Sequence, residues 1–254
     1  MQMTGNTILI TGGGTGIGLA FAKRFVARGN HVIICGRRAE PLATAKSETP
    51  ALETIQCDVS TEANRIALAE EVIAKFPSLN VLINNAGIMR FETLDRSRDL
   101  ADSEATISTN LLGPIRLTNA LIDHLAGQSG ATIVNVTSGL AFVPLVMTPT
   151  YNATKAAIHA YTVAMREALQ GKVEVIELVP PAVQTGLTPG QESRAGYQPL
   201  DEFANEVMAL FARQPTPREI LVECVGFLRF AEAEGRFDET LAKLNAFEAR
   251  GRAA

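Results

Sequence analysis

The chain has 254 residues, of which 46% are hydrophobic and 20% are charged. This length predicts one large domain or two small ones, with enough apolar side chains for a large core. The formal net charge of -4 at pH 7 argues against binding to a nucleic-acid backbone, because proteins that do so are usually basic.

The cysteines and the N-terminus argue against secreted and membrane classes. Three cysteines, an odd number, do not make a disulfide framework, and Cys35 and Cys57 sit in apolar runs where buried thiols are expected. No apolar stretch approaches the roughly 18 residues of a membrane span. The start, MQMTGNTILIT, has no basic segment of the kind that opens a secretory signal. We therefore expect a cytoplasmic enzyme without a membrane or nucleic-acid partner.

Strand-like and helix-like segments alternate along the chain. The apolar runs predict strands at Thr7–Thr11, His31–Cys35, Leu52–Cys57, Val81–Asn84, Ile133–Val136, Val173–Val179 and Glu219–Val222. The patterns between them predict helices at Gly18–Arg28, Ala39–Ser47, Thr61–Phe76, Ser103–Leu125 (interrupted at Gly113-Pro114), Tyr151–Leu169, Leu200–Ala212 and in the C-terminal segment.

Short continuous strands separated by helices are typical of βαβ units and a parallel sheet that is covered on both faces. No linker, repeat or low-complexity segment divides the chain. We expect residues 1–254 to form a single α/β domain of the Rossmann type, doubly wound around a mostly parallel seven-stranded sheet.

Two irregular segments follow predicted strands, where open α/β sheets bind ligands. Residues 138–150 (SGLAFVPLVMTPT) are largely apolar, which favours a hydrophobic wall for a substrate. The alternative is a loop that simply packs on the core. Residues 180–199 form the second irregular segment.

A glycine-rich turn, TGGGTGIG at residues 11–18, lies between the first predicted strand and helix. Glycines let a backbone turn tightly and approach a pyrophosphate, whose charge then lies at the helix N-terminus. The spacing is T-G-x-x-x-G-x-G rather than the common G-x-G-x-x-G. Its position directly after the first strand favours a dinucleotide site over a plain tight turn. The residues that we expect to bind the dinucleotide here are Gly12, Thr15, Gly16, Ile17 and Gly18.

Arg37 and Arg38 follow the second strand, where an NAD site usually presents an acidic side chain to the adenosine ribose. Two guanidiniums suit a 2′-phosphate instead, which favours NADP(H) and makes NAD(H) the weaker candidate. Two solvated arginines at a helix start are the plain alternative. Asp58, after the third strand, could accept a hydrogen bond from an adenine amino group or cap the next helix.

Small polar residues follow the fourth strand, and an asparagine lies within a predicted helix. Asn84-Asn85-Ala86-Gly87 would let a ligand lie close to the backbone. Asn110 is a mediocre helix former inside a helical segment, which makes a functional role plausible.

Ser138, Tyr151 and Lys155 form the decisive group. Tyr151 and Lys155 are four residues apart at a helix start, so both side chains share one face. An ammonium beside a phenol favours the phenolate and should lower the pKa of Tyr151 from its ordinary value near 10. Such a phenol can give a proton to a carbonyl oxygen while a nicotinamide delivers hydride. Ser138 could hydrogen-bond the same oxygen.

In combination these motifs resemble the short-chain dehydrogenase/reductase family, from Thr7 to about Thr185. The residues that carry the resemblance are TGGGTGIG, Asp58-Val59, NNAG, Asn110, Ser138 and YNATK. The stretches VTSGLAF and IELVPPAVQT are similar to a branch of that family, the DltE-like oxidoreductases.

The resemblance implies a catalytic set of Ser138, Tyr151, Lys155 and Asn110, with Asn110 holding a water in the proton relay. It also implies that Lys155 binds the nicotinamide ribose. The other cofactor-binding positions that it implies are Asp58, Val59, Asn85, Ala86, Gly87, Pro180, Val183 and Thr185. The family usually has Pro-Gly after the sixth strand, whereas this chain has Pro180-Pro181, and Pro181 lacks an N–H and fixes φ.

Other functions fit the sequence less well. A serine hydrolase would need a G-x-S-x-G elbow, but Ser138 sits in V-T-S-G-L. The three histidines form no zinc motif, so no metal is expected, and His159 is interpreted as a structural residue. A dinucleotide-binding sensor or regulator without turnover remains the alternative from another class.

We therefore expect an NADPH-preferring oxidoreductase that interconverts a carbonyl and a secondary alcohol on a small or medium, rather apolar substrate. The helices 103–125 and 151–169 carry apolar residues on more than one face, and members of the family pair through these helices. We expect a homodimer or homotetramer, unless residues 237–254 fold back over the exposed stripe.

Overall fold

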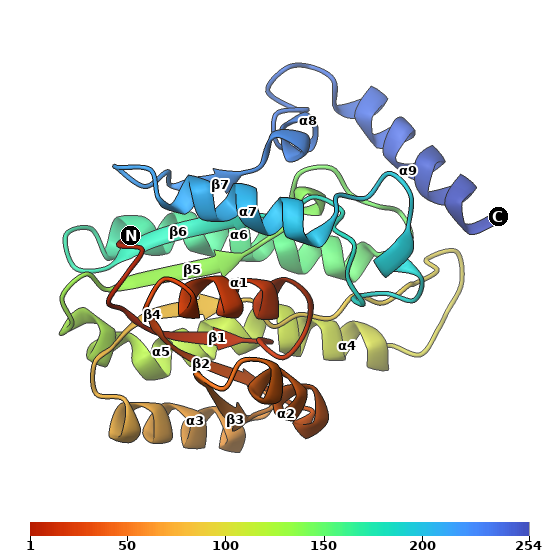
Figure 1. The fold of residues 1–254 in the computed structure, drawn as a ribbon. Helices are drawn as coiled ribbons and strands as arrows, with labels where there is room; N and C mark the ends of the chain where they lie inside the picture. Colours follow the sequence, from red (N-terminus) through yellow and green to blue (C-terminus); the bar gives the residue numbers. More distant parts are fainter. Residues whose placement is uncertain (254) are drawn as a thin grey trace.

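The computed structural model describes the backbone of residues 1–253 and the side chains of residues 1–250. Within these residues seven strands form one sheet, whose registered pairs are all parallel, in the order β3-β2-β1-β4-β5-β6-β7 (Figure 1). The strands are β1 Thr7–Thr11, β2 His31–Gly36, β3 Leu52–Gln56, β4 Leu79–Asn84, β5 Thr132–Val136, β6 Glu174–Val179 and β7 Glu219–Leu221. The Rossmann-type fold expected from the alternating pattern is confirmed.

The helices surround this sheet and follow the expected segments closely. They are α1 Gly16–Val26, α2 Ala39–Glu48, α3 Glu62–Lys75, α4 Ala101–Ile107, α5 Gly113–Ala126, α6 Pro149–Ala168, α7 Leu200–Phe211, α8 Gly226–Arg229 and α9 Phe237–Ala253. The α6 helix begins two residues before Tyr151, because Pro149 suits a first helical turn, where the missing N–H costs nothing.

The irregularity in the segment 103–125 lies earlier than its sequence suggests. Residues 108–112 form a π-helical turn that connects α4 to α5, and Pro114 lies in the first turn of α5. The expected interruption at Gly113-Pro114 is therefore wrong in position, since proline is tolerated at a helix start. Asn110 lies in the π-helical turn, a feature that is often found at functional sites.

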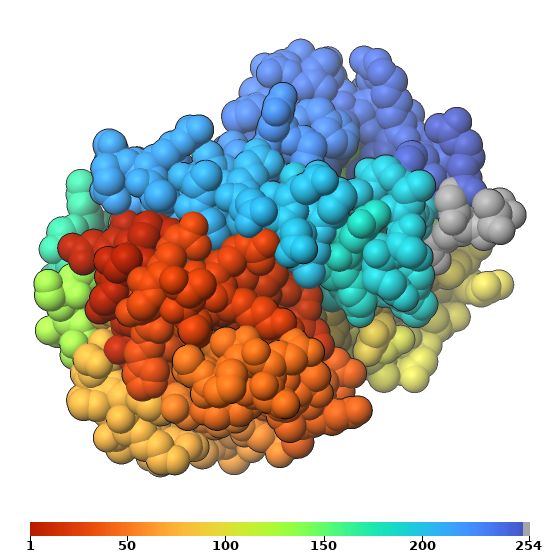
Figure 2. All heavy atoms as spheres, in the orientation of Figure 1, coloured from red at the N-terminus to blue at the C-terminus, as the bar shows by residue number. Residues whose placement is uncertain are grey.

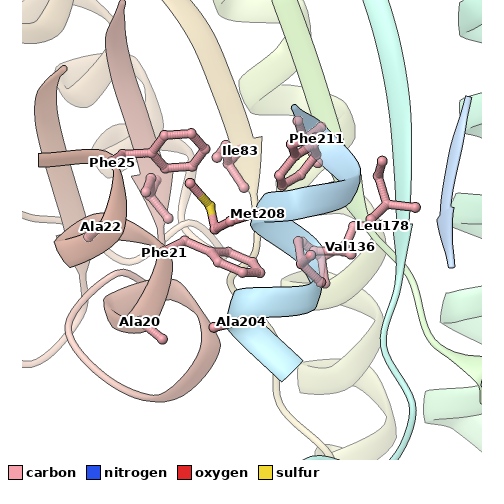
Figure 3. Packing of buried hydrophobic residues seen from close by; sticks show 14 of the residues in the cluster. Ala20, Phe21, Ala22, Phe25, Ile83, Val136, Leu178, Ala204, Met208 and Phe211 are labelled. Carbon is pink, nitrogen blue, oxygen red and sulfur yellow. The ribbon is translucent and has the colours of Figure 1, made fainter. Parts of the chain in front are cut away.

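Successive residues of the central strands enter two separate cores. Ile8 and Ile10 of β1 pack with α1 and α7, where Phe21, Phe25 and Phe211 meet (Figure 3). Leu9 points to the opposite face and packs with residues of α3, α5 and α6. The central strand β1 is thus buried on both faces, which explains why the middle of its sequence, TILIT, is continuously apolar.

The strand order reverses between β1 and β4, and this reversal opens a crevice at their carboxyl ends. The backbone there is packed very closely. A Cβ on Gly18 would lie 2.5 Å from the Gly12 oxygen and 2.6 Å from Asn85 Nδ2. Only glycine lets α1 approach the two loops so closely, which corresponds to the packing role of the last glycine in dinucleotide-binding turns.

The C-terminal helix α9 packs on the loops that follow β5 and β6. Asn245 Oδ1 accepts a hydrogen bond from Val146 N at 2.8 Å, and Glu248 receives one from Tyr197 Oη at 2.7 Å. In the space-filling view the C-terminal segment lies at one end of the molecule, beside the segment near residue 190 (Figure 2). The C-terminal helix therefore does not fold back over the apolar stripe of α6, because Ala156 and Val163 in that stripe are exposed.

Among the described residues, no helix combines the length and the apolar character needed to span a bilayer.

Candidate functional site

A cavity of about 390 Å³ lies at the carboxyl ends of the strands. Most of the residues expected from the sequence line it. They are Gly12, Thr15, Gly16, Ile17, Arg37, Arg38, Asp58, Val59, Asn85, Ala86, Gly87, Ser138, Tyr151, Lys155, Pro180, Val183 and Thr185. Gly18 and Asn110 do not line the cavity, but each contacts residues that do: Gly18 packs against Gly12 and Asn85, and Asn110 hydrogen-bonds Ile88.

The glycine turn offers a backbone cradle at the start of α1. Gly12 and Gly16 have φ values of +64° and +52°, which L side chains rarely adopt. Thr15 precedes α1 but makes no side-chain cap, and the first turn of the helix carries no acidic residue. Its N–H groups are therefore available to an anion, as a pyrophosphate site requires.

The end of β4 holds this turn in place. Asn85 Nδ2 donates to the carbonyls of Thr11 at 2.9 Å and Gly12 at 3.2 Å. Thr11 Oγ1 accepts from the backbone N–H groups of Asn85 and Ala86, each at 3.0 Å. Asn85, expected as a cofactor contact, thus lines the cavity and also fixes the shape of the glycine turn.

Asn110 fixes the next stretch of the same loop. Its Oδ1 accepts from Ile88 N and its Nδ2 donates to Ile88 O, each at 2.8 Å. Both polar atoms of this buried side chain are thereby engaged with one backbone unit. In the described structure Asn110 positions Ile88, a lining residue, while its neighbour Thr109 reaches the cavity itself.

The end of the cavity beside the carboxyl end of β2 is cationic. Arg37 and Arg38 are exposed, and neither guanidinium forms an ion pair or a side-chain hydrogen bond with a described residue. Asp58 Oδ1 accepts from the N–H of Ser60 at 2.9 Å and from its hydroxyl at 2.7 Å. Since α3 begins at Glu62 with Thr61 as its N-cap residue, Asp58 does not cap that helix.

Ser138, Tyr151 and Lys155 meet at the other end. All three are buried and line the cavity, and the Ser138 hydroxyl lies near enough to the Tyr151 phenol to influence its titration. Lys155 Nζ donates to the Val136 carbonyl at 2.8 Å and lies 5.5 Å from the centroid of the Tyr151 ring. The end of β5 therefore holds both Ser138 and the lysine ammonium beside the phenol.

Burial dominates the titration of this pair. It raises the pKa of Tyr151 to about 12, although the neighbouring Ser138 hydroxyl acts in the opposite direction. Burial also lowers the pKa of Lys155 to about 8. The expectation of a lowered pKa at Tyr151 is wrong for this structure, because removal of water disfavours the phenolate and the ammonium points to Val136 O.

The segment after β6 keeps its expected place despite Pro181. Gln198 N donates to Ala182 O and Gln184 N donates to Gln198 O, both at 2.9 Å, so the chain after the proline is held extended. Val183 and Thr185 accordingly line the cavity.

The loop 139–150, by contrast, contributes no residue to the cavity lining. Val143 is buried against Leu228 and Ala231, and Leu145 is also buried. Val143 and Leu145 therefore follow the alternative of a loop that packs on the core, whereas Val146 is 68% exposed, and the apolar substrate wall stays a prediction.

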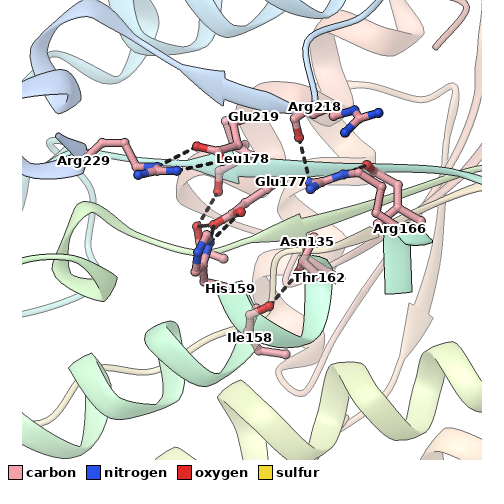
Figure 4. A network of polar contacts seen from close by, with 12 residues as sticks. Asn135, Ile158, His159, Thr162, Arg166, Glu177, Leu178, Arg218, Glu219 and Arg229 are labelled. Carbon is pink, nitrogen blue, oxygen red and sulfur yellow. Dashed lines mark hydrogen bonds and ion pairs between the residues drawn. The ribbon is translucent and has the colours of Figure 1, made fainter. Parts of the chain in front are cut away.

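His159 is a structural residue, as its isolation from any metal motif indicated. Its Nδ1 lies 2.8 Å from Glu177 Oε2 (Figure 4). The buried Glu177 also accepts from Thr137 Oγ1 at 2.8 Å. Within the residues that the structure describes, no group of histidine, cysteine and acidic side chains could hold a metal ion.

Several lining residues escaped the sequence argument. Ile88 and Arg90 follow the NNAG motif, so proximity to that motif could have indicated them. Gln191 had no such signal. It reaches the cavity because its amide donates to Val183 O at 2.8 Å and Thr185 Oγ1 at 3.2 Å.

A protein-family model described as short chain dehydrogenase matches residues 6–195. The chain belongs to this family. It is 46% identical over 252 residues to the uncharacterized oxidoreductase DltE of Bacillus subtilis strain 168. The aligned region covers 98% of this chain and 100% of that protein. The resemblance stated from the motifs is confirmed, and the protein is an oxidoreductase of the short-chain dehydrogenase type.

Solved structures of the family have the same fold. A 3-ketoacyl-(acyl-carrier-protein) reductase from Brucella melitensis, complexed with NADH, is 28% identical with a TM-score of 0.76, over 85% of this chain and 93% of that one. A serine dehydrogenase complexed with NADP+ is 25% identical with a TM-score of 0.74, over 82% and 89%.

The buried ammonium of Lys155 should lower the stability of the folded protein at neutral pH. The folded state holds this proton less tightly than the unfolded chain, so wild-type stability rises between pH 8 and the ordinary lysine value of 10.5. We expect Lys155→Met to raise the free energy of unfolding at pH 7 by roughly 1–3 kcal/mol, with a gain that shrinks toward pH 10.5.

Urea unfolding between pH 6.5 and 10 measures this difference. Lys172→Met is the matched control, because Lys172 is exposed and should change stability little at any pH. A gain for Lys155→Met that is equally large at pH 7 and pH 10 would contradict the burial argument.

Proposed function

We propose that this protein is an NADP(H)-dependent oxidoreductase that interconverts a carbonyl and a secondary alcohol, with Tyr151 as the general acid–base. One observation carries the proposal. The buried set of Ser138, Tyr151 and Lys155 lines the same cavity as the glycine turn at the start of α1. Cofactor and proton donor therefore have a common site.

The residues present fit a dinucleotide. The positive-φ glycines open a cradle at the N-terminus of α1, and Asn85 keeps that cradle in shape. When bound there, a nicotinamide cofactor would supply or accept a hydride. Lys155 would hold the nicotinamide ribose, and Val183 and Thr185 would face the nicotinamide amide.

Tyr151 has the properties of a proton donor during carbonyl reduction. A phenol whose pKa is about 12 is fully protonated at neutral pH, so it can donate to a developing alkoxide. Ser138 would hydrogen-bond the same oxygen. Lys155, positively charged below about pH 8, would stabilise the phenolate that remains after the transfer.

The preference for NADP(H) rests on Arg37 and Arg38. Both line the cavity after β2, and their guanidiniums have no described carboxylate partner that a ribose phosphate would need to displace. Arginine matches phosphate through several planar donors. The serine dehydrogenase to which the chain is similar is complexed with NADP+, and the ketoacyl reductase with NADH, so relatives use both cofactors.

The substrate in this proposal is a small-molecule carbonyl or alcohol, and the protein would act in the cytoplasm without a membrane or nucleic-acid partner. A sensor that binds the dinucleotide without turnover is the alternative. Oxidation of NADPH with a panel of ketones distinguishes the two, since a sensor would bind the cofactor but leave it unchanged.

A homodimer or homotetramer is part of the proposal. The α6 helix exposes apolar residues at helical spacing, namely Ala153, Ala156, Ala160, Val163 and Ala164. Ile107, at the end of α4, is 39% exposed. Small and apolar side chains on one face favour close packing against a second copy.

We expect Tyr151→Phe to lower turnover by about 10²–10⁴-fold with nearly unchanged cofactor affinity. The substitution removes only the hydroxyl and keeps the ring packing. Steady-state rates and fluorescence titration with NADPH measure the two quantities, and Tyr161→Phe on the same helix is the control. A Tyr151→Phe enzyme with more than half of the wild-type activity would refute the mechanism.

Arg37→Ala and Arg38→Ala should each raise the Michaelis constant for NADPH by about tenfold or more, because each loses a charge-assisted bond to the 2′-phosphate. NADH, which lacks that phosphate, should be affected little. Arg213→Ala, an exposed arginine outside the cavity lining, serves as the control. Equal losses for both cofactors, or a wild-type preference for NADH, would overturn the assignment.

Light scattering on the purified protein tests the assembly. The chain has a mass of 27.2 kDa, so we expect about twice or four times that value across micromolar concentrations. A value near the mass of one chain at all concentrations would show a monomer and contradict this part of the proposal.

A further inference from the structure

Glu92 lies outside the motifs and outside the cavity lining, yet its carboxylate is a centre of hydrogen bonding. It belongs to the segment between β4 and α4, and its side chain is only 3% exposed. Arg98 Nη2 donates to it at 2.6 Å and Ser103 Oγ at 2.7 Å. Thr150 donates twice, from its hydroxyl at 2.7 Å and from its backbone N–H at 3.1 Å.

The two bonds from Thr150 are made at the N-terminus of α6. Thr148, the N-cap residue of this helix, makes no side-chain cap. The N–H groups of a first helical turn have no partner within the helix, and a carboxylate there is favoured by both hydrogen bonding and the helix dipole. Glu92 thus supplies from another segment the cap that the helix lacks.

This contact is directly adjacent to the reactive group. Thr150 precedes Tyr151, so the capped turn is the turn that carries the phenol. Glu92 N also donates to Met147 O at 2.9 Å, which ties the same segment to the chain just before α6. Earlier in the segment, Ile88 lines the cavity and is held by Asn110.

We propose that Glu92 is a positioning residue, which clamps the first turn of α6 to the segment after β4 and so fixes Tyr151 relative to Ser138. The inference rests on the proposed function, in which Tyr151 transfers a proton. Glu92 touches neither substrate nor cofactor. It acts through Thr150, and a misplacement of about 1 Å at a reacting group can cost roughly a hundredfold in rate.

The charge of Glu92 is maintained despite its burial. Burial raises the pKa of this carboxyl, but the hydrogen bonds from Thr150 and Ser103 and the charge of Arg98 outweigh that effect, so its pKa lies below the ordinary value. The clamp is therefore a carboxylate throughout the neutral pH range, and its bonds are charge-assisted.

Glu92→Ala is the first test. We expect turnover to fall about tenfold or more while the dissociation constant for NADPH changes less than twofold, because the glycine turn and the arginines are unaffected. Arg24→Met is the matched control. It removes a charged side chain that joins α1 to Asp201 and Asn205 of α7, away from Tyr151, and should leave turnover unchanged.

Hydrogen exchange provides a readout that is independent of activity. In Glu92→Ala we expect faster exchange in the peptide that covers residues 147–155, whereas Arg24→Met should leave that peptide as in the wild type. The exchange measurement tests the clamp separately from the proposed function, because it gives a result even if the protein reduces no ketone.

A charge-neutral variant tests the role of the carboxylate itself. In Glu92→Gln the amide oxygen can keep the three donors that meet Oε2, but the NH2 group then faces the Thr150 N–H, so we expect a loss of turnover through the lost cap. Arg98→Met alone should have a smaller effect than Glu92→Ala.

The proposal is overturned if Glu92→Ala keeps more than half of the wild-type turnover. It is equally overturned if exchange at 147–155 is unchanged, or if NADPH affinity falls as much as turnover does. If both arms respond only in proportion to the fraction of unfolded protein, measured by thermal melting in the same buffer, the role is structural and the proposal fails.

Discussion

The close approach of the glycine turn to the end of β4 is the constraint on which the site depends. Gly12 and Gly18 leave no room for a Cβ, and Asn85 spans the gap by donating to the carbonyls of Thr11 and Gly12. β1 and β4 are neighbours at the point where the strand order reverses, so the loops that follow them flank the crevice at their carboxyl ends. The packing that closes the core on this side therefore also shapes the cradle for a dinucleotide.

At the reactive end, opposite this cradle, removal of the side chains from water sets the pKa values. Lys155 and Tyr151 are buried, so burial lowers the pKa of the lysine to about 8 and raises that of the tyrosine to about 12. The carbonyl of Val136 compensates the ammonium in part, at 2.8 Å. A buried charge of this kind costs stability, which is a common feature of sites that are organised for chemistry rather than for folding.

Two polar networks hold the reactive end from outside the cavity. Glu177 connects His159 of α6 to Thr137, the residue before Ser138, and Glu92 connects Thr150 of α6 to the segment after β4. Both carboxylates are buried and fully engaged, as buried charges must be if they are not to destabilise the fold. Together they fix one helix against the two loops that carry the other site residues.

The sequence by itself determined the class of fold, the family and most of the lining of the cavity. Strands that are buried on both faces are mostly apolar, so the pattern of the sequence predicts them. A glycine turn or a Tyr–Lys pair is formed by residues close together along the chain, so the sequence also reveals these motifs. Only the tertiary structure decided that Val143 and Leu145 of loop 139–150 are buried, that burial raises the pKa of Tyr151, and that Glu92 caps α6. Each of these depends on contacts between segments that are distant in sequence. A local sequence pattern does not show which of these segments pack together and exclude water from each other's side chains.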